Sequence, residues 1–508
     1  MNGIIELSSV DCDEIKRILT SIHEKSTFEL KTATALPKSF WETYSSFANT
    51  EGGWIILGVK EEWAANEIVG VPNAEKVVTD LWNLASNKNK VSFRCIENGD
   101  VHVVRIDGLE VVLVHVPEAP DSMKPVFING KISDTYLRTG DGDRKATQEE
   151  INALLRNATS GSDGILLDHF SMQDLDPVSV ANYKAAVHTR YPSKGYIKQS
   201  DAEFLSEIGA CVKDRVSGEL KIKRGALLFL GKCNSIKEVF PSYHLDFFDR
   251  RGDNPRWRDR VSDDEPGENE CNLYNFFNIV RAKLGNLLKS SFELDKESQL
   301  RLPVSDFDET LRECLVNCLA HADYVQGYPS VKIEAFDGWF RFLNPGKMLV
   351  SKEQFIAGGD SRPRNEIVMK LFRLLGASER QGFGGPQIFK SAAEHQFRYP
   401  EIETDLEKTE LIVWNIDLAE SYPSLREDDK LVLRLIMKSV SLSIPEIAKL
   451  TGITDYKVRK SITRLEEDAL IVKSGNGPST KYLLRPTSME HLTQLQLAME
   501  QMRRAWSH

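Results

Sequence analysis

Three glutamates and one lysine near the start of the chain have types and spacing that could do phosphate chemistry. Glu24 and Glu29 are followed by Lys31, and Glu61 stands shortly after an apolar run. Carboxylates gathered at one point repel each other unless a cation lies among them, and Mg2+ or Mn2+ prefers such oxygen ligands. The ion would activate water and stabilise charge on a phosphate, and the lysine would position the reacting groups. The alternative is a set of solvated surface charges, because most glutamates and lysines lie on surfaces.

The elements around these residues are expected to bring them together. Residues 28–31 alternate apolar and charged side chains, which predicts a strand with Glu29 and Lys31 on one face. Residues 54–59 predict a buried strand with Glu61 at its end. If the two strands are neighbours, the acidic side chains and the lysine converge on one point. The helix expected between them has an apolar stripe made of Phe40, Tyr44 and Phe47.

These motifs resemble a known family. The run EKSTFELK at 24–31, the run SFANTEGG at 46–53 and GlyVal at 58–59 are similar to the Schlafen AlbA-type domain, over about residues 10–156. In nuclease members of that family, the two acids of the first run and an acid after the Gly-Val strand end form the metal site.

The resemblance implies a metal site made of Glu24, Glu29 and Glu61, with Lys31 beside it. The third acid is usually Asp, and here Lys60 fills the acidic position before Glu61. Many bacterial members are described only as nucleic-acid-binding proteins or regulators. Fold similarity alone therefore does not give nuclease activity.

Composition limits the class of protein. The 508 residues are 41% hydrophobic and 28% charged, which is typical of a soluble globular chain of three or four domains. The formal net charge of −10 does not indicate a nucleic-acid binder, so any such binding requires local basic patches. No apolar run approaches the ~20 residues of a membrane span, and the N-terminus lacks the features of a signal peptide. We expect a cytoplasmic protein of the α+β multidomain class.

The remainder of the first domain, at 1–156, is expected to contain one helix at 73–85, strands at 91–96, 101–106 and 110–116, and a turn at 135–144. Arg138, Arg144 and Lys145 around this turn are candidates for phosphate contact, and a solvated turn is the alternative. Thr147 and Glu150 form a capping box that opens a further helix. A linker is predicted at 157–164.

A middle α/β domain is predicted at 165–300. Residues 223–232 contain an apolar run with basic ends and are interpreted as a buried strand. The loop at 249–260 combines five arginines with a tryptophan, a composition suited to phosphate contact and base stacking. Three aspartates in the same loop favour the alternative of internal ion pairs. The candidate nucleic-acid contacts are Arg250, Arg251, Arg256 and Arg258.

A helix in the third domain, at 301–415, carries Glu313, Asn317 and His321 on one face. This helix resembles the histidine-kinase-type (GHKL) ATPase fold, and more closely the recG-helicase-like C-terminal subfamily. The resemblance implies that the Glu places a water and that the Asn holds Mg2+ on the phosphates of ATP. Asn344 or Leu343 stands where that fold has an adenine-reading Asp. The alternative is a polar helix face at Asn317 and an ordinary turn at the glycines, without a nucleotide. Further candidates in the glycine-containing segments are Gly346, Gly382 and Gly384.

The last predicted domain is a winged helix at 424–486, followed by a helical tail at 487–508. Recognition helices of this fold place basic residues in the major groove, and winged helices also bind other proteins. The expected recognition helix, at 455–468, can present Lys457, Arg459, Lys460 and Arg464 outward. An apolar stripe in the tail predicts self-association into dimers or larger oligomers.

Three functions are consistent with these features. The first is a metal-dependent endonuclease that cuts structured RNA such as tRNA, in phage defence or a stress response, gated by the C-terminal domains. The second is a non-catalytic DNA-binding transcriptional regulator. The third is a nucleotide-binding ATPase switch. All three imply nucleic acid or nucleotide partners and none implies a membrane.

Overall fold

The computed structural model describes residues 27–485, together with residues 16, 19 and 20. The gaps within it are 63–64, 141, 160, 253–255, 265–269, 295–303, 360–361, 379–383, 396, 423, 440, 476 and 478–479. Glu24, Gly382 and the predicted tail at 487–508 therefore lie outside the described residues. The chain divides into two compact units, Met1–Thr159 and Ser160–His508. Among the described residues, no helix combines the length and apolar composition of a membrane span.

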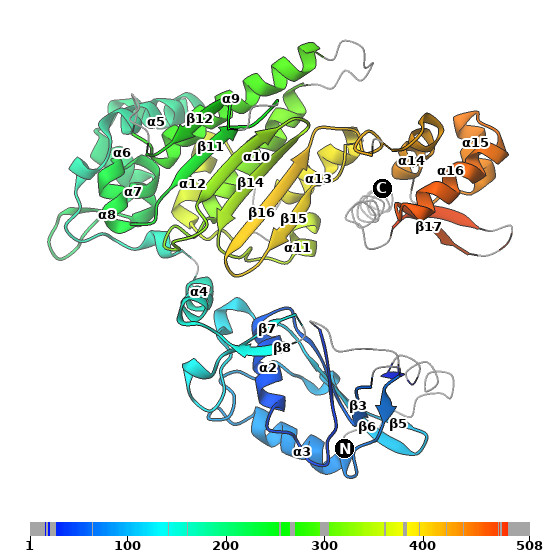
Figure 1. The fold of residues 1–508 in the computed structure, drawn as a ribbon. Helices are drawn as coiled ribbons and strands as arrows, with labels where there is room; N and C mark the ends of the chain where they lie inside the picture. The colour runs from blue at the N-terminus through cyan, green and yellow to red at the C-terminus, as the bar shows by residue number, and fades with distance from the viewer. Residues whose placement is uncertain are drawn as a thin grey trace. The chain divides into compact units, whose positions relative to one another are not determined.

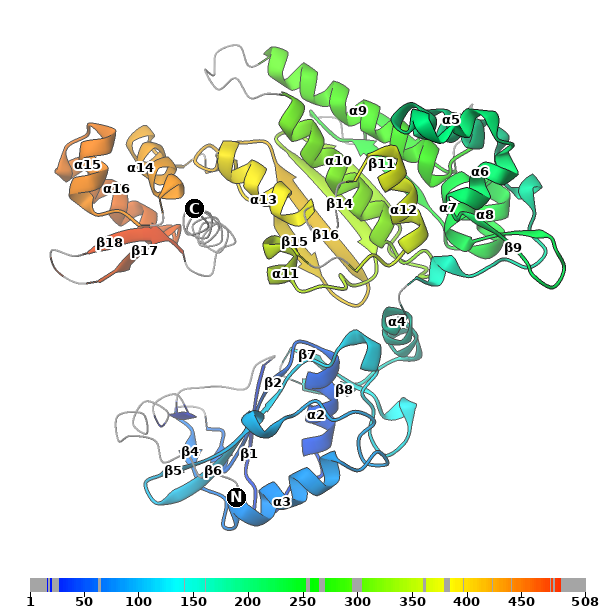
Figure 2. The same cartoon turned by 180° about the vertical axis from the view of Figure 1, so that it is seen from behind.

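The first unit is built on a four-stranded sheet of order β1-β2-β6-β5 (Figures 1 and 2). The strands are β1 (Phe28–Lys31), β2 (Gly53–Leu57), β6 (Leu109–Val116) and β5 (Val101–Ile106). β1 pairs with β2 in parallel, with Glu29 opposite Ile55. The prediction that these two strands are neighbours is confirmed.

Both faces of this sheet are apolar, which differs from the expectation of one core face. Leu30 packs with Ile56 in the smaller cluster. On the other face, Ile55 packs with helix α2 (Phe40–Asn49), whose stripe residues are fully buried. Glu29 shares that face because register partners in paired strands point to the same side, and it is only 9% exposed.

Two helices among the remaining elements of the first unit were predicted, and its two short hairpins were not. These elements are the pair β3 (Val59–Lys60) and β4 (Glu67–Ile68), α3 (Ala74–Ala85), the hairpin β7 (Tyr136–Thr139) and β8 (Gly142–Lys145), and α4 (Gln148–Ala158). The strand expected at 91–96 is wrong, because Val91 makes only an isolated bridge to Ile128. The backbone N–H of Cys95 donates instead to the Tyr44 hydroxyl at 2.6 Å.

The second unit contains a six-stranded sheet of order β12-β11-β13-β14-β16-β15. Helices cover one face of this sheet, as the two opposite views show (Figures 1 and 2). The strands are β11 (Leu245–Asp249), β12 (Asp259–Ser262), β13 (Val331–Phe336), β14 (Trp339–Pro345), β15 (Glu401–Thr404) and β16 (Lys408–Trp414). The helices on it are α9 (Leu273–Leu294), α10 (Val304–His321), α12 (Glu366–Leu375) and α13 (Gly384–His395).

This sheet corrects the predicted domain boundary at residue 300. β11 comes before that position and pairs in parallel with β13, which comes after it. The middle region and the ATPase-like region therefore share one sheet and one continuous core. The sequence could not show this, because strand pairing over so long a separation leaves no local signal.

The apolar run at 223–232 is a helix, and its interpretation as a strand is wrong. Residues Arg224–Leu230 form α7, and every residue from Gly225 to Leu230 is buried. A short run that is apolar on all sides has no periodicity that separates a buried strand from a buried helix. The neighbouring elements are α5 (Pro177–Arg190), α6 (Asp201–Glu207), α8 (Cys233–Val239) and the hairpin β9 (Cys211–Lys213) and β10 (Leu220–Ile222).

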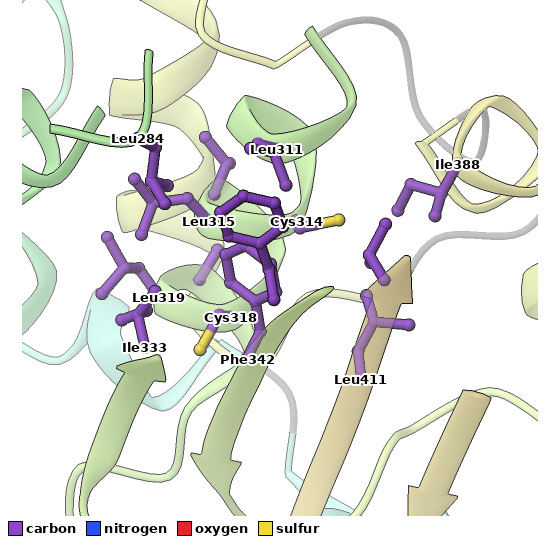
Figure 3. Close-up of a cluster of buried hydrophobic side chains, with 14 of the residues drawn as sticks. Leu284, Leu311, Cys314, Leu315, Cys318, Leu319, Ile333, Phe342, Ile388 and Leu411 are labelled. Atoms are coloured by element: carbon purple, nitrogen blue, oxygen red, sulfur yellow. The ribbon is translucent and has the colours of Figure 1, made fainter. Parts of the chain in front are cut away.

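Helix α10 is the central support of the second unit. Its residues Leu311, Leu315 and Leu319 are at most 1% exposed and pack on the sheet and on α9 (Figure 3). Burial of each such leucine contributes roughly 1.5–3 kcal/mol. This stripe fixes the rotation of the helix about its axis, and Asn317 lies on a different face of the helix from the three leucines. The predicted packing of α10 is confirmed.

The winged helix has the predicted elements. They are α14 (Glu427–Lys438), α15 (Ile444–Thr451), α16 (Asp455–Glu467) and the wing strands β17 (Ile471–Ser474) and β18 (Lys481–Leu484). Leu442 forms a bridge with Tyr482, which joins the wing to the segment before α15. Val458, Ile462 and Leu465 of α16 face inward, as predicted.

Candidate functional site

Glu29 lies in a compact cluster of paired charges. Its Oε1 is 2.5 Å from Nζ of Lys31, and its Oε2 is 2.9 Å from Nη1 of Arg138. The same Nη1 is 3.0 Å from Oδ1 of Asp143. The Arg138 side chain is 2% exposed, and the other three side chains are 11–13% exposed. The cluster therefore contains two cations and two carboxylates.

Arg138 holds this cluster together. Its Nη2 donates to the Phe28 carbonyl at 3.1 Å, and its guanidinium lies 5.2 Å from the centre of the Phe47 ring. Thr43 donates to Asp143 at 2.6 Å. Such a buried arginine is costly unless all its partners stay in place, so its role in the described residues is to join β7 to β1. Asp143 was not predicted, since an Asp in a Gly-Asp turn gives no distinguishing signal.

The predicted metal site lies partly outside the described residues. Glu61 is exposed after β3, and Glu24 lies outside the described residues. In the described part of the chain, the one group of His, Cys, Asp and Glu close enough to hold an ion is His244, Asp263 and Asp264. The trio from the sequence remains a prediction.

The other two candidates for phosphate contact in the first unit, Arg144 and Lys145, lie in β8 and are exposed and paired. Arg144 Nη2 lies 2.6 Å from Glu150, the capping-box residue of α4. Lys145 Nζ lies 2.7 Å from Asp134, and this contact raises the pKa of Lys145. Exposed pairs of this kind contribute little to stability, so both cations can exchange their partners for a phosphate.

The basic-aromatic loop has one arginine paired within the loop and another paired with the neighbouring strand β13. Arg250 lies 2.5 Å from Glu334 of β13, and Arg251 pairs with Asp249 at 3.0 Å. Trp257 packs on Phe248 with ring centres 5.4 Å apart. The two remaining candidates, Arg256 and Arg258, are exposed.

A pocket in the second unit brings together most of the predicted nucleotide-binding residues. Glu313, Asn317 and His321 reach it from α10, Asn344 from β14 and Gly384 from the start of α13. Gly346, which adopts a φ of 90°, lies at the end of β14 next to Arg364 and Asp323. The pocket walls are mainly apolar and include Cys318, Phe342, Met348, Ile402 and Leu411.

Two of the polar residues of this pocket are buried. Asn344 and Glu313 are each 5% exposed. Asn317 Nδ2 lies 3.4 Å from Glu313 Oε1, and the Glu313 carboxylate lies against the backbone of Gly384. Burial lowers the pKa of His321 to about 4, with a smaller contribution from Arg364, so its imidazole is neutral at pH 7.

The pocket also contains an arginine that the sequence did not suggest. Arg373 of α12 lines it, and its Nε is buried without a hydrogen-bond partner among the described residues. A buried unpaired donor is costly, and an anionic ligand would satisfy it. Arg362 and Thr409 also line the pocket. Arg373 carries no motif, and only the packing of α12 reveals it.

The recognition helix of the winged helix divides its four candidate cations into two groups. Arg464 pairs with Asp429 of α14, whose side chain is 1% exposed, so the prediction that it faces outward is wrong. Lys457 lies 3.0 Å from Asp428. Arg459 and Lys460 are exposed.

Local charge and an aromatic ring complete this surface. Lys460 Nζ lies 4.8 Å from the centre of the Tyr456 ring, which is 66% exposed. Residues 424–485 contain twelve Lys and Arg against eight Asp and Glu, in a chain whose net charge is −10. The winged helix is therefore a basic region of an acidic protein.

Comparisons with solved structures and curated proteins gave limited likeness. The DIP2311 protein from Corynebacterium diphtheriae is 14% identical over 93% of this chain and 98% of its own, with a TM-score of 0.39. The N-terminal domain of a protein related to the ATP-dependent DNA helicase RecG, from Nitrosomonas europaea, is 27% identical. That match covers 28% of this chain and 94% of its own, with a TM-score of 0.21. The comparison with curated proteins gave no match.

Family models match three segments of the chain. Residues 24–147 match the Schlafen AlbA_2 model, and residues 329–413 match the model described as ATP-dependent DNA helicase recG C-terminal. Residues 152–246 match a domain of unknown function, DUF8451. The first two models associate the chain with nucleic-acid binding. The chain thus contains a segment similar to the Schlafen AlbA_2 family at 24–147 and a segment similar to the recG C-terminal family at 329–413.

Proposed function

We propose that this protein is a DNA-binding regulator whose winged helix docks on duplex DNA under the control of a nucleotide in the pocket of the second unit. The observation that carries the proposal is the surface of α16, where Tyr456, Arg459 and Lys460 are exposed together. Arg464 pairs with Asp429 and orients the helix.

The chemistry of this surface suits the duplex. A recognition helix enters the major groove with its N-terminal residues, and Tyr456, Arg459 and Lys460 all lie in the first two turns of α16. Arginine can contact a guanine edge through two hydrogen bonds, and lysine can neutralise a phosphate. Affinity that depends on such contacts falls as salt is added.

The pocket supports a nucleotide as the controlling ligand. A planar base would lie between the apolar walls, with Asn344 as a buried polar contact, and the Arg373 side chain lines the pocket as a cation for an anion. ATP would supply the negative charge and, with Mg2+ held by Asn317, a cleavable phosphoanhydride. Neutral His321 can donate or accept a hydrogen bond without adding charge. Hydrolysis through Glu313 is a further expectation and is not required for control.

DNA binding is tested on the full chain with duplex libraries, read by fluorescence anisotropy. The variant Arg459→Glu/Lys460→Glu should weaken binding about 100-fold. It should also make the slope of log affinity against log salt concentration shallower, by the amount expected for the loss of roughly two phosphate contacts. Lys194→Glu/Lys198→Glu changes the charge equally at exposed sites elsewhere in the second unit and should have no effect. Equal losses in both variants would show non-specific attraction and contradict the proposal.

A metal-dependent endonuclease acting on structured RNA is the second candidate. It is favoured by the parallel pairing of β1 with β2, which sets Glu29 and Lys31 beside the strand that leads to Glu61. Lys31 contacts Glu29, so its ammonium group lies beside the proposed metal ligand, where it could orient the phosphate to be cleaved. The role in phage defence or stress remains an expectation from the family.

The nuclease is tested with total tRNA, single-stranded RNA and duplex DNA, in Mn2+, Mg2+ or EDTA. Glu61→Ala is the most informative variant, because Glu61 is exposed and is not one of the four residues of the buried charge cluster. A Glu24→Ala/Glu29→Ala variant runs beside it. Metal-dependent cleavage that both variants lose would establish the nuclease, whereas cleavage that Glu61→Ala retains would exclude this metal site.

A further inference from the structure

One buried carboxylate ties the segment that joins the two units to helix α12. Composition predicted a linker at 157–164, yet Asp163 is 2% exposed. Its Oδ2 accepts the N–H groups of Ile367 at 2.8 Å and Val368 at 3.0 Å. These amides belong to the first turn of α12, where donors have no partner within the helix and the dipole favours an anion.

The fit around this contact is close. A Cβ added to Gly225 of α7 would lie 2.5 Å from Asp163 Oδ2 and 2.7 Å from Ile367 Cβ. Gly161 has a φ of 73°, and a Cβ there would meet the Glu366 carboxylate at 3.3 Å. The joining segment is thus packed between α7 and the start of α12, and its position depends on both.

The same helix forms part of the pocket. Met369 and Arg373 of α12 line it, as does Arg362 in the segment just before the helix. Asn365, at the N-cap, donates to the Ala320 carbonyl at 3.1 Å, at the end of α10. A ligand that draws Arg373 towards its anion therefore acts on the helix whose first turn holds Asp163.

We propose that Asp163 transmits occupancy of the pocket to the segment that joins the two units. This inference rests on the proposed binding of a nucleotide. A helix moves as a rigid rod, and hydrogen bonds weaken steeply with misalignment, so a displacement of α12 changes both bonds to Asp163 together. By linkage, a joining segment released from α12 changes ligand affinity by the same factor.

The test is hydrogen exchange of the full chain, followed by mass spectrometry, with and without Mg2+ and a non-hydrolysable ATP analogue. The unmodified protein is compared with Asp163→Ala and with Asp168→Ala. Asp168 is a control carboxylate in the same segment, 73% exposed and 2.6 Å from Lys221. Exchange is read in α10 and α12, which report on the pocket, and at 157–167, which reports on the joining segment.

We expect the ligand to slow exchange in α12 and to change exchange at 157–167 by about fivefold, the lower end of measured couplings. Asp168→Ala should keep both effects. Asp163→Ala should keep the slower exchange in α12 and lose the change at 157–167. A protected pocket with an unchanged joining segment, or a response that survives in Asp163→Ala, overturns the proposal and leaves nucleotide binding intact. No protection of the pocket at all refutes nucleotide binding and the coupling with it.

Discussion

At the scale of single residues, the clearest finding concerns Glu29. The sequence predicts it as a metal ligand, and the structure surrounds it with Lys31 and Arg138. The same side chains can support a fold or a reaction, because a paired charge cluster and a resting active site have the same composition. Substitutions that separate stability from activity are therefore the informative ones.

Arg138→Met should destabilise the first unit by about 3 kcal/mol, since it leaves Glu29 and Asp143 partly unpaired in a buried site. The measurement is thermal unfolding of the full chain. Arg144→Met removes an exposed pair with Glu150 and should cost no more than about 1 kcal/mol. Similar losses in the two variants would show that the cluster is not a structural centre.

Asp163 makes stability depend on pH. Burial raises its pKa to about 6, above the unfolded value of about 3.9. The folded state then holds the proton more tightly than the unfolded state does. The contribution of Asp163 to the free energy of unfolding is therefore most favourable at low pH and declines as pH rises from about 4 to about 6. Asp163→Asn removes this dependence, and the difference in melting temperature from the unmodified protein should change between pH 4.5 and 7.5. A difference that is constant with pH would contradict the assignment.

At the scale of elements, helix α7 shows that tertiary packing determines the secondary structure of an apolar run without periodicity. Its six residues from Gly225 to Leu230 are buried among α9, α12 and the joining segment. Gly225 is needed at the closest approach, because no side chain fits between α7 and Asp163.

Gly225→Ala should therefore destabilise the second unit by about 1–3 kcal/mol, the usual cost of overpacking. Gly164→Ala is the matched control, because a Cβ there meets nothing within 4 Å. Differential scanning calorimetry of the full chain gives both values. A neutral Gly225→Ala would mean that α7 can move away from the joining segment without cost.

At the scale of the whole molecule, the division at Thr159 and Ser160 predicts separable unfolding. Each unit has its own core, so calorimetry of the full chain should show more than one transition. Arg138→Met should lower one transition and Gly225→Ala another. A single transition that both variants shift equally would show that the two units unfold as one.

Self-association is the second prediction at this scale. It rests on the apolar stripe in the tail at 487–508, outside the described residues, and so remains a prediction. Sedimentation of the full chain at micromolar concentration should give a dimer or a larger species, and replacement of Leu492 and Leu495 by Glu should give monomers. A monomer in the unmodified protein would refute it.

The sequence by itself determined the elements with local signals. Periodicity gave the strand at 28–31, the stripe of α10 and the helices of the winged helix, and capping boxes gave the starts of α4 and α15. Such signals are local because each depends on residues within one or two turns or on alternate positions of a strand.

Only the tertiary structure decided what lies opposite these elements. It joined β11 to β13 across the predicted boundary, made the run at 224–230 a helix, and turned Arg464 inward to Asp429. It also revealed Arg373 in the pocket and Asp163 at the start of α12. Strand pairing, burial and charge balance depend on residues brought together from distant positions in the chain. No local sequence pattern identifies these distant partners.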